Sequence, residues 1–225
     1  MSEREHAPQR TTGIFAILSS ARMYDFVQDS LGARNFRKRF VADYITPLAK
    51  PGAKVLDVGC GTGAILEYLK GTRYLGLDLS EPYVESARKR YGSEGRFLCA
   101  NVSDVAIADG EGPFDVIIMT GLLHHLSDGE VSDLFAAVAR TLAPGGSVLT
   151  IDPTFAWDSH AFARFLAARD RGRHVRRPPA YGALAEKSFA DVTVDVRHDL
   201  LRVPYSHAIL TLRAPRAAGS AEHAA

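Results

Sequence analysis

The chain of 225 residues has little cysteine, little tryptophan and no long apolar run. Its two cysteines, Cys60 and Cys99, exclude a disulfide scaffold, and we expect both to be buried thiols in a reducing compartment. No apolar run approaches the roughly 20 residues that span a bilayer, and the polar start MSEREHAPQR does not fit a signal peptide. We therefore expect a cytoplasmic location.

The sequence also has no excess of charge of one sign. Its 27 Lys and Arg residues nearly balance 26 Asp and Glu residues, which gives a net charge of +1. Such a balance does not indicate a surface for nucleic acid or anionic membrane. Hydrophobic residues make up 46% of the chain, which is ample for the core of one domain.

The most informative segment is KVLDVGCGTGAIL, residues 54–66. A short apolar strand leads into Gly59, Gly61 and Gly63 and then into an apolar helix start, and α/β folds bind nucleotide-like ligands at such turns. The spacing G-x-G-x-G differs from the G-x-G-x-x-G of dinucleotide-binding turns. The segment therefore predicts a nucleoside site that is not that of an NAD dehydrogenase.

Two carboxylates accompany this turn. Asp57 stands two residues before Gly59, where it would repel a pyrophosphate but suits a ligand that carries an ammonium group. Asp78 ends the next apolar run, nineteen residues after Gly59, and is placed to hydrogen-bond a ribose. The ends of two neighbouring strands thus indicate one adenosine.

Strands and helices alternate along the chain. The predicted strands are 54–58, 73–78, 96–100, 114–120, 147–152, 192–198 and 206–213. The predicted helices are 35–48, about 63–70, 81–91 with Ser80 as N-cap and Gly92 as stop, and 128–142 with a Ser127-x-x-Glu130 capping box and a stop at Pro144-Gly145-Gly146. Five strands joined by helices predict a parallel sheet with helices on both faces. The last two strands are joined by a short loop and must pair antiparallel.

On Val55-Leu56-Asp57-Val58-Gly59-Cys60-Gly61-Thr62-Gly63 and Asp78, the chain resembles the class I, Rossmann-like S-adenosylmethionine-dependent methyltransferases of small-molecule type. The resemblance covers about residues 35–213. It implies an α/β fold with a seven-stranded, mostly parallel sheet in the order 3-2-1-4-5-7-6, whose last strand is antiparallel. We expect one domain over 1–213, with a cofactor-binding core at 35–152, a substrate-capping segment at 153–190 and a loose tail at 214–225.

The resemblance implies S-adenosyl-L-methionine as cofactor, with S-adenosyl-L-homocysteine as product. Asp57 and the backbone of Gly59 and Gly61 would hold the methionine moiety, and Asp78 would accept both ribose hydroxyls. Asn101 stands where the family commonly has an acid, and its amide oxygen can accept from the adenine amine. The other implied contacts are Leu79, Val102, Thr120, Gly121 and Tyr24, and Tyr24 is either a lid over the cofactor or a core aromatic.

The chemistry is expected where TGLLHHL, residues 120–126, leaves the fourth strand. A sulfonium methyl group is already activated, so the protein mainly aligns a nucleophile and removes its proton, a task that suits histidine with its pKa near ~6.5. We expect the adjacent His124 and His125 to face different ways. In proteins that this chain resembles, the position of His125 is very often His and orients the loop, so we favour His124 as the base. Asp152 and His160 are alternatives.

The segment between the fifth strand and the terminal hairpin is expected to cover the acceptor. A predicted lid helix at 159–169 follows Trp157, the only tryptophan. Five arginines occur among the nine residues 169–177, and they form either a solvated loop or an anion site. The candidate substrate residues are Trp157, His160, Arg173 and Arg176.

Three functions remain open. The first is a methyltransferase for a small acceptor, as an O-methyltransferase of a natural-product or sugar-type hydroxyl. The second is an RNA or protein methyltransferase that uses the basic segment Arg169–Arg177, although the fourth strand lacks the Asn/Asp-Pro-Pro-Tyr/Phe signature and nucleic acid is not expected. The third is a non-catalytic protein, which would be expected to have lost part of the glycine motif. We expect no metal, because no acidic triplet ends the fourth strand, and no membrane partner; monomer and homodimer both remain open.

Overall fold

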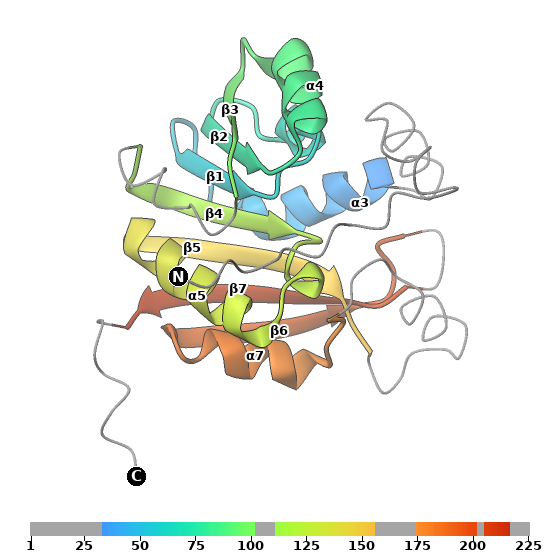
Figure 1. Ribbon diagram of the computed structural model, residues 1–225, viewed down its shortest axis with the longest axis vertical. Helices are drawn as coiled ribbons and strands as arrows, with labels where there is room; N and C mark the ends of the chain where they lie inside the picture. The colour runs from blue at the N-terminus through green and yellow to red at the C-terminus, as the bar shows by residue number, and fades with distance from the viewer. Residues whose placement is uncertain (1–32, 102–110, 156–173, 202–204, 217–225) are drawn as a thin grey trace, which may run out of the picture.

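The computed structural model describes residues 33–101, 111–155, 174–201 and 205–216. Seven strands form one sheet in the order β3-β2-β1-β4-β5-β7-β6, which confirms the predicted order (Figure 1). The strands are β1 (Lys54–Val58), β2 (Arg73–Asp78), β3 (Gly95–Cys99), β4 (Phe114–Thr120), β5 (Leu142–Pro153), β6 (Phe189–Arg197) and β7 (His207–Pro215).

The first five strands run parallel, and β7 runs antiparallel to both of its neighbours, β5 and β6. Because these five strands are parallel, β1, β2, β3, β4 and β5 all end at the same edge of the sheet. We call it the carboxyl edge. β7 begins there too, because its first residue, His207, pairs with Pro153 at the end of β5.

Helices cover both faces of the sheet, as predicted. One face packs against α3 (Ala33–Phe40), the π-helix η1 (Val41–Ile45), the 3-10 helix η2 (Ala64–Tyr68) and α4 (Glu81–Tyr91), whose buried side chains form one apolar cluster with the strands. The other face packs against α5 (Asp128–Thr141) and α7 (Pro178–Ala185). Each fully buried Leu, Ile, Phe or Val contributes about 1.5–3 kcal/mol to such a core.

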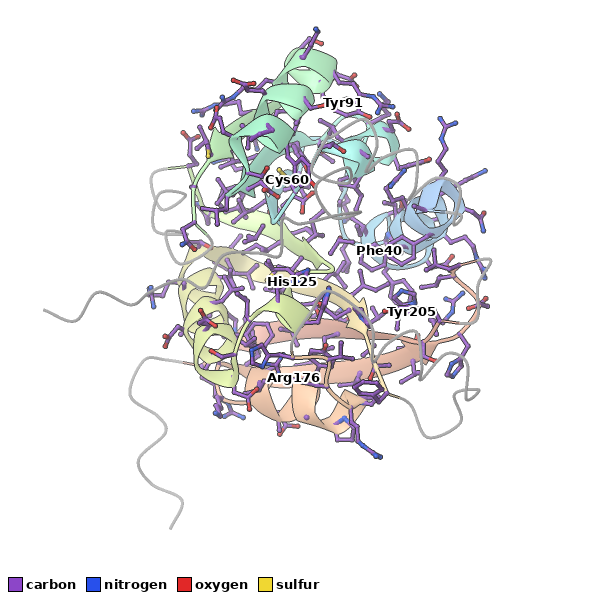
Figure 2. The ribbon with its side chains drawn as sticks, turned by 45° about the vertical axis from the view of Figure 1, so that its right-hand side comes forward. Phe40, Cys60, Tyr91, His125, Arg176 and Tyr205 are labelled. Carbon is purple, nitrogen blue, oxygen red and sulfur yellow. The ribbon has the colours of Figure 1, made fainter. Side chains whose placement is uncertain are left out.

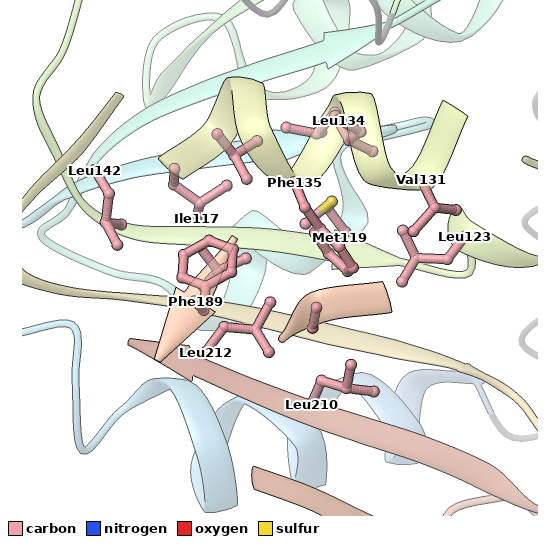
Figure 3. Packing of buried hydrophobic residues seen from close by; sticks show 14 of the residues in the cluster. Ile117, Met119, Leu123, Val131, Leu134, Phe135, Leu142, Phe189, Leu210 and Leu212 are labelled. Atoms are coloured by element: carbon pink, nitrogen blue, oxygen red, sulfur yellow. The ribbon is translucent and has the colours of Figure 1, made fainter. Parts of the chain in front are cut away.

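Helix α5 shows how the sequence pattern produces this packing. Its buried residues Val131, Leu134, Phe135 and Val138 recur at helical spacing and belong to one apolar cluster with Ile117 and Met119 of β4. Figure 3 shows Val131, Leu134 and Phe135 packed against that strand. The predicted capping box is present, with the Ser127 side chain accepting from the backbone of Glu130 and the Glu130 side chain accepting from the backbone of Ser127. The start of this helix, and with it the end of the preceding loop, is therefore fixed.

Some predicted boundaries differ from the structure. The helix expected at about 63–70 is a 3-10 helix of five residues, because Gly63 at its start is left-handed and the chain already turns at Gly71 with φ 79° to enter β2. The helix expected at 35–48 ends as the π-helix η1. Gly92 stops α4 in a right-handed conformation with φ −62°. β5 begins at Leu142 and β7 continues to Pro215, two residues into the expected tail.

The expected capping segment at 153–190 also differs. Its second half belongs to the core, since Tyr181 of α7 and Phe189 of β6 are fully buried in the α5 cluster. The predicted lid helix at 159–169 lies outside the described residues.

Candidate active site

The turn after β1 follows from its three alternating glycines. Gly59, Gly61 and Gly63 have φ values of 78°, 55° and 71°, a left-handed region that other residues rarely adopt. The turn is tied to β2, because the backbone N–H groups of Gly59 and Cys60 both donate to the carbonyl of Leu77, at 2.7 and 2.9 Å. A Cβ on Gly61 would meet no atom within 4 Å, so this glycine lines open space.

Asp57 lies under this turn and is 2% exposed. The Tyr74 hydroxyl donates to its Oδ2 at 2.5 Å, while Oδ1 has no hydrogen-bond partner among the described residues. Burial raises the pKa of Asp57 to about 7; the Tyr74 hydrogen bond lowers it and the nearby Asp78 charge adds to the rise. A buried carboxylate with one oxygen that has no hydrogen-bond partner in the described part of the chain suits a cationic group.

Asp78 ends β2 and holds the glycine turn from the other side. Its Oδ2 accepts from the Gly61 N–H at 2.7 Å, and its Oδ1 accepts from the Ser80 N–H at 2.9 Å. Burial raises its pKa, and these two N–H groups lower it. Each oxygen keeps a second lone pair for a ribose hydroxyl. The adjacent Leu79 is 64% exposed, which offers an apolar surface beside the ribose position.

Three further predicted cofactor residues lie at or beyond the carboxyl edge. Thr120 ends β4, and its buried Oγ1 has no hydrogen-bond partner within the described part of the chain. Gly121 has φ 64° and donates its N–H to Ile151 of β5 at 2.8 Å. Asn101 follows β3 and is half-buried. The edge therefore brings together the ends of β1, β2, β3 and β4, as the resemblance implied.

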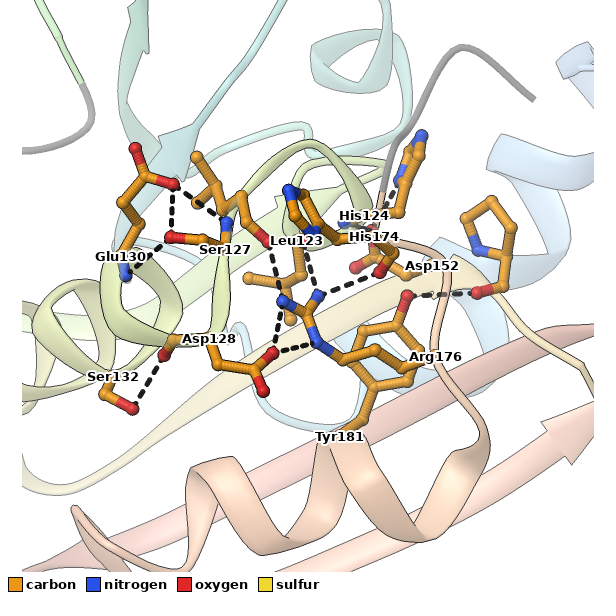
Figure 4. A network of polar contacts seen from close by, with 12 residues as sticks. Leu123, His124, Ser127, Asp128, Glu130, Ser132, Asp152, His174, Arg176 and Tyr181 are labelled. Atoms are coloured by element: carbon orange, nitrogen blue, oxygen red, sulfur yellow. Dashed lines mark hydrogen bonds and ion pairs between the residues drawn. The ribbon is translucent and has the colours of Figure 1, made fainter.

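His124 and Asp152 form a buried pair between β4 and β5. His124 lies in the 3-10 helix η4 (Leu123–His125), and its side chain is 6% exposed. Asp152 Oδ1 lies 3.1 Å from the backbone N of His124 and 2.8 Å from its Nδ1 (Figure 4). Burial raises the pKa of Asp152, and the hydrogen bonds from His124 lower it.

This geometry sets the imidazole in one orientation. Because Asp152 Oδ1 is an acceptor, we assign the ring proton to Nδ1, which makes Nε2 the basic ring nitrogen of His124. A Cβ on Gly121 would lie 3.7 Å from Cε1 of His124, so the Cε1 edge of the ring lies beside the predicted cofactor residue Gly121.

The two histidines differ from the prediction in one respect. Their rings are not turned apart, since the centroids of His124 and His125 lie 4.0 Å from each other. The contacts expected of His125, those that orient the loop, are made by His124, whereas His125 is exposed. In the view of Figure 2, Cys60 of the glycine turn, His125 and Arg176 follow one another down the molecule.

Arg176 is neither a solvated residue nor an open anion site. It is buried, pairs with Asp128 and donates to the carbonyls of Leu123, Leu126 and His174. Its guanidinium also lies over the Tyr181 ring, at 5.6 Å from the centroid. The expectation that Arg176 binds the acceptor is therefore not what the structure shows, because its donors are directed at the chain itself.

Five predicted site residues lie outside the described residues: Tyr24, Val102, Trp157, His160 and Arg173. Of the two cysteines, Cys60 is half-buried and Cys99 is exposed, which corrects the prediction that both are buried. Burial raises the pKa of the Cys60 thiol, and the charges of Asp57 and Asp78 raise it further. In the described ranges, no three His, Cys, Asp or Glu side chains group as metal ligands, and no helix is long and apolar enough to cross a membrane.

The pattern analysis missed several residues that shape this site. Position 76 does not tolerate a side chain, because a Cβ on Gly76 would lie 2.8 Å from Sγ of Cys60 and 2.9 Å from Phe97. Tyr74 was assigned only to an apolar strand, although its hydroxyl orients Asp57. The sequence offers Asp152 as an alternative base but gives no sign that it is the partner of His124. Neither pairing could be found from spacing, because each joins different elements of the fold.

Comparisons with known proteins indicate a methyltransferase domain. Residues 55–146 match the family described as "Methyltransferase domain". The chain is 38% identical over 117 residues to the ubiquinone biosynthesis O-methyltransferase of Thiobacillus denitrificans, covering 50% of this chain and 48% of that protein. It is 40% identical over 101 residues to the probable tRNA methyltransferase 9B of Mus musculus, covering 44% and 22%. The chain thus spans less than half the length of each of these relatives.

Among solved structures, human N-acetylserotonin methyltransferase in complex with S-adenosylmethionine shares the fold, with a TM-score of 0.64 at 20% identity over 92% of this chain and 60% of that one. The sheet order and the matched domain lead to the same conclusion. Residues 55–146 thus form a methyltransferase domain, and the chain has the fold of the class I, Rossmann-like methyltransferases, with S-adenosylmethionine as the cofactor that these comparisons support.

Proposed function

We propose that this protein transfers a methyl group from S-adenosylmethionine to a hydroxyl of a small-molecule acceptor, and that His124 takes the proton from that hydroxyl. The observation that carries the proposal is the buried His124–Asp152 pair beside Gly121. The 38% identity to an O-methyltransferase supports the choice of an oxygen nucleophile.

The residues at the carboxyl edge fit the cofactor. The buried Oδ1 of Asp57, which lacks a hydrogen-bond partner among the described residues, suits the ammonium of the methionine moiety, and the space above Gly61 admits a ligand close to the backbone. Asp78 would accept the ribose hydroxyls, and exposed Leu79 would cover an adenine face. Thr120 Oγ1 is a further buried polar atom on the methyl side. When bound, the cofactor supplies a methyl group that its sulfonium charge has already activated.

His124 then performs the protein's part of the reaction. Its Nε2 accepts the hydroxyl proton of the acceptor, while Nδ1–H stays on Asp152. The Asp152 carboxylate stabilises the imidazolium that forms, as the buried carboxylate does in other His–Asp pairs. Because Asp152 comes from β5, the sheet holds the carboxylate that orients the His124 ring, and His124 itself lies in η4, just beyond β4.

A second candidate, methylation of RNA, is favoured by the 40% identity to a probable tRNA methyltransferase. That match covers only 22% of the relative, and Arg176 of the basic segment is buried in contacts with the chain. The experiment that separates the two is an acceptor screen in which release of S-adenosylhomocysteine is measured with phenols, sugars, anionic hydroxy compounds and unmodified tRNA. Turnover with a small hydroxyl compound supports our proposal, and turnover with tRNA alone would replace it.

A further inference from the structure

Arg176 lies at the centre of a polar network that surrounds the histidine loop (Figure 4). Its Nε donates to Asp128 Oδ1 at 2.8 Å, and Nη2 lies 2.8 Å from the same oxygen. Nη1 donates to the carbonyls of Leu123 at 2.9 Å and His174 at 3.0 Å, and Nη2 donates to Leu126 at 2.6 Å. Four hydrogen bonds and one ion pair thus direct the guanidinium at the chain itself.

The carbonyls that Arg176 holds flank the two histidines. Leu123 directly precedes His124, and Leu126 directly follows His125, so one guanidinium fixes both ends of η4. The backbone N–H of His174 also donates to the carbonyl of His124 at 3.0 Å. His174 and Arg176 thus both hold the backbone of this loop.

Stability alone does not explain this arrangement. The Asp128 side chain is 75% exposed, so the Arg176–Asp128 pair combines one buried and one solvated partner. A buried ion pair is often replaced by apolar residues without loss of stability. Three main-chain carbonyls held by a planar, rigid donor group instead fix the path of a short loop in one geometry.

We propose that Arg176 is a positioning residue that holds His124 in one ring orientation, with Nδ1–H on Asp152. The relevance of this orientation to catalysis rests on the proposed function. Asp152 sets the ring from the β5 side and Arg176 sets the backbone on which the ring is mounted. Neither needs to touch the acceptor.

The test that needs no acceptor is ¹⁵N NMR of the imidazoles in protein labelled at histidine. The signals of His124 are assigned by their loss in His124→Gln. In the wild-type protein we expect the shifts of a single Nδ1–H tautomer. In Arg176→Ala the two ring nitrogens should move toward the shifts of mixed tautomers, and guanidinium ions should restore the wild-type signals by filling the space left by the side chain. Arg176→Lys should give a partial change, because a lysine cannot hold three carbonyls and Asp128 at once.

The matched control is Arg177→Ala, which removes an exposed arginine next in sequence. It should leave the His124 signals unchanged. Wild-type shifts for His124 in Arg176→Ala and in Arg176→Lys would overturn the proposal. If Arg176→Ala does not fold, Arg176→Lys alone decides, since it keeps the buried charge.

Turnover gives a second readout. With an acceptor from the screen, Arg176→Ala should lower kcat by about tenfold or more, as misplacement of a reacting group does, with unchanged S-adenosylmethionine affinity and little change in acceptor KM. A raised KM with unchanged kcat would overturn the proposal and return Arg176 to acceptor binding. If the NMR result is as expected but His124→Gln keeps full turnover, the proposed base is wrong and the positioning by Arg176 still holds.

Discussion

The hydroxyl of Tyr74 donates a 2.5 Å hydrogen bond to Oδ2 of Asp57, and among the described residues Oδ1 of this buried carboxylate has no partner. Tyr74 comes from β2 and Asp57 from β1, so the neighbouring strand decides which oxygen is available. The arrangement costs stability, because a buried carboxylate is charged without a cation beside it. It suits a site that is completed by a cationic ligand.

The affinity for S-adenosylmethionine should depend on pH through Asp57. Burial raises its pKa to about 7, and only the ionised form attracts an ammonium group. We would titrate calorimetrically between pH 5.5 and 8, which spans about one and a half units below that pKa and one above it. The affinity should rise with pH and level off above 7. Asp57→Asn should bind weakly at every pH. Persistence of the wild-type pH dependence in Asp57→Asn would refute this role, and Asp115→Asn at the opposite end of the sheet serves as the control.

The same substitution should stabilise the ligand-free protein. The folded pKa of Asp57 lies above its unfolded value of 3.8, so stability is lost as the pH rises from about 4 to 7. The difference corresponds to about 4 kcal/mol above pH 7 as an order of magnitude. Urea unfolding should show Asp57→Asn more stable than wild type at pH 8, with a smaller difference at pH 5. Equal stability at both values would contradict the burial argument.

Three glycine-to-alanine variants separate strain from ligand contact. Gly61→Ala and Gly71→Ala each place a side chain at positive φ in open space, with φ 55° and 79°, and should each cost about 1–2 kcal/mol. Gly63→Ala adds a clash, since its Cβ would lie 2.7 Å from Phe97, and should be the least stable in thermal melts. Titration with S-adenosylhomocysteine should show a lower affinity for Gly61→Ala than for Gly71→Ala. Equal affinities of these two would argue against a ligand above Gly61.

Asp78 should contribute both to the glycine turn and to ribose binding. Asp78→Asn replaces one accepting oxygen by an amide that cannot accept the N–H of Gly61 or Ser80. We expect S-adenosylmethionine and S-adenosylhomocysteine to bind more weakly by about 1.5–3 kcal/mol. Glu81→Gln, an exposed acid in the next helix, is the control and should bind normally. Unaltered affinity in Asp78→Asn would remove Asp78 from the cofactor site.

The capping box of α5 offers a prediction about stability alone. Ser127→Ala removes the side chain that accepts from the Glu130 backbone and should cost about 1 kcal/mol in urea unfolding. Ser132→Ala, which removes a hydroxyl that donates to Asp128 within the same helix, should cost less. If the two variants were equally stable, the box would not fix the start of α5.

Much of the fold could be predicted because local pattern and topology agree. β1, β2, β4 and α4 begin and end where alternation, Gly and Ser80 indicated, and the short connection between β6 and β7 required their antiparallel pairing. The turn could be recognised because glycines at alternate positions predict a backbone with positive φ angles. Local signals of this kind lie within a few residues of each other.

What could not be predicted depends on contacts between distant strands. The burial of Arg176 follows from Leu123, Leu126 and Asp128, about fifty residues away, and a basic run gives no sign of such partners. The division of roles between His124 and His125 depends on Asp152, which lies on the adjacent strand. Sequence spacing carries no information on either pairing.

The most direct test of the account compares His124→Gln with His125→Gln. Both variants are titrated with S-adenosylmethionine and then assayed in single turnover with an acceptor identified by the screen. We predict wild-type cofactor affinity in both, a loss of about 100-fold or more in rate for His124→Gln, and a rate near wild type for His125→Gln. A rate that stays high in His124→Gln and falls in His125→Gln would contradict the assignment and place proton removal at the exposed histidine.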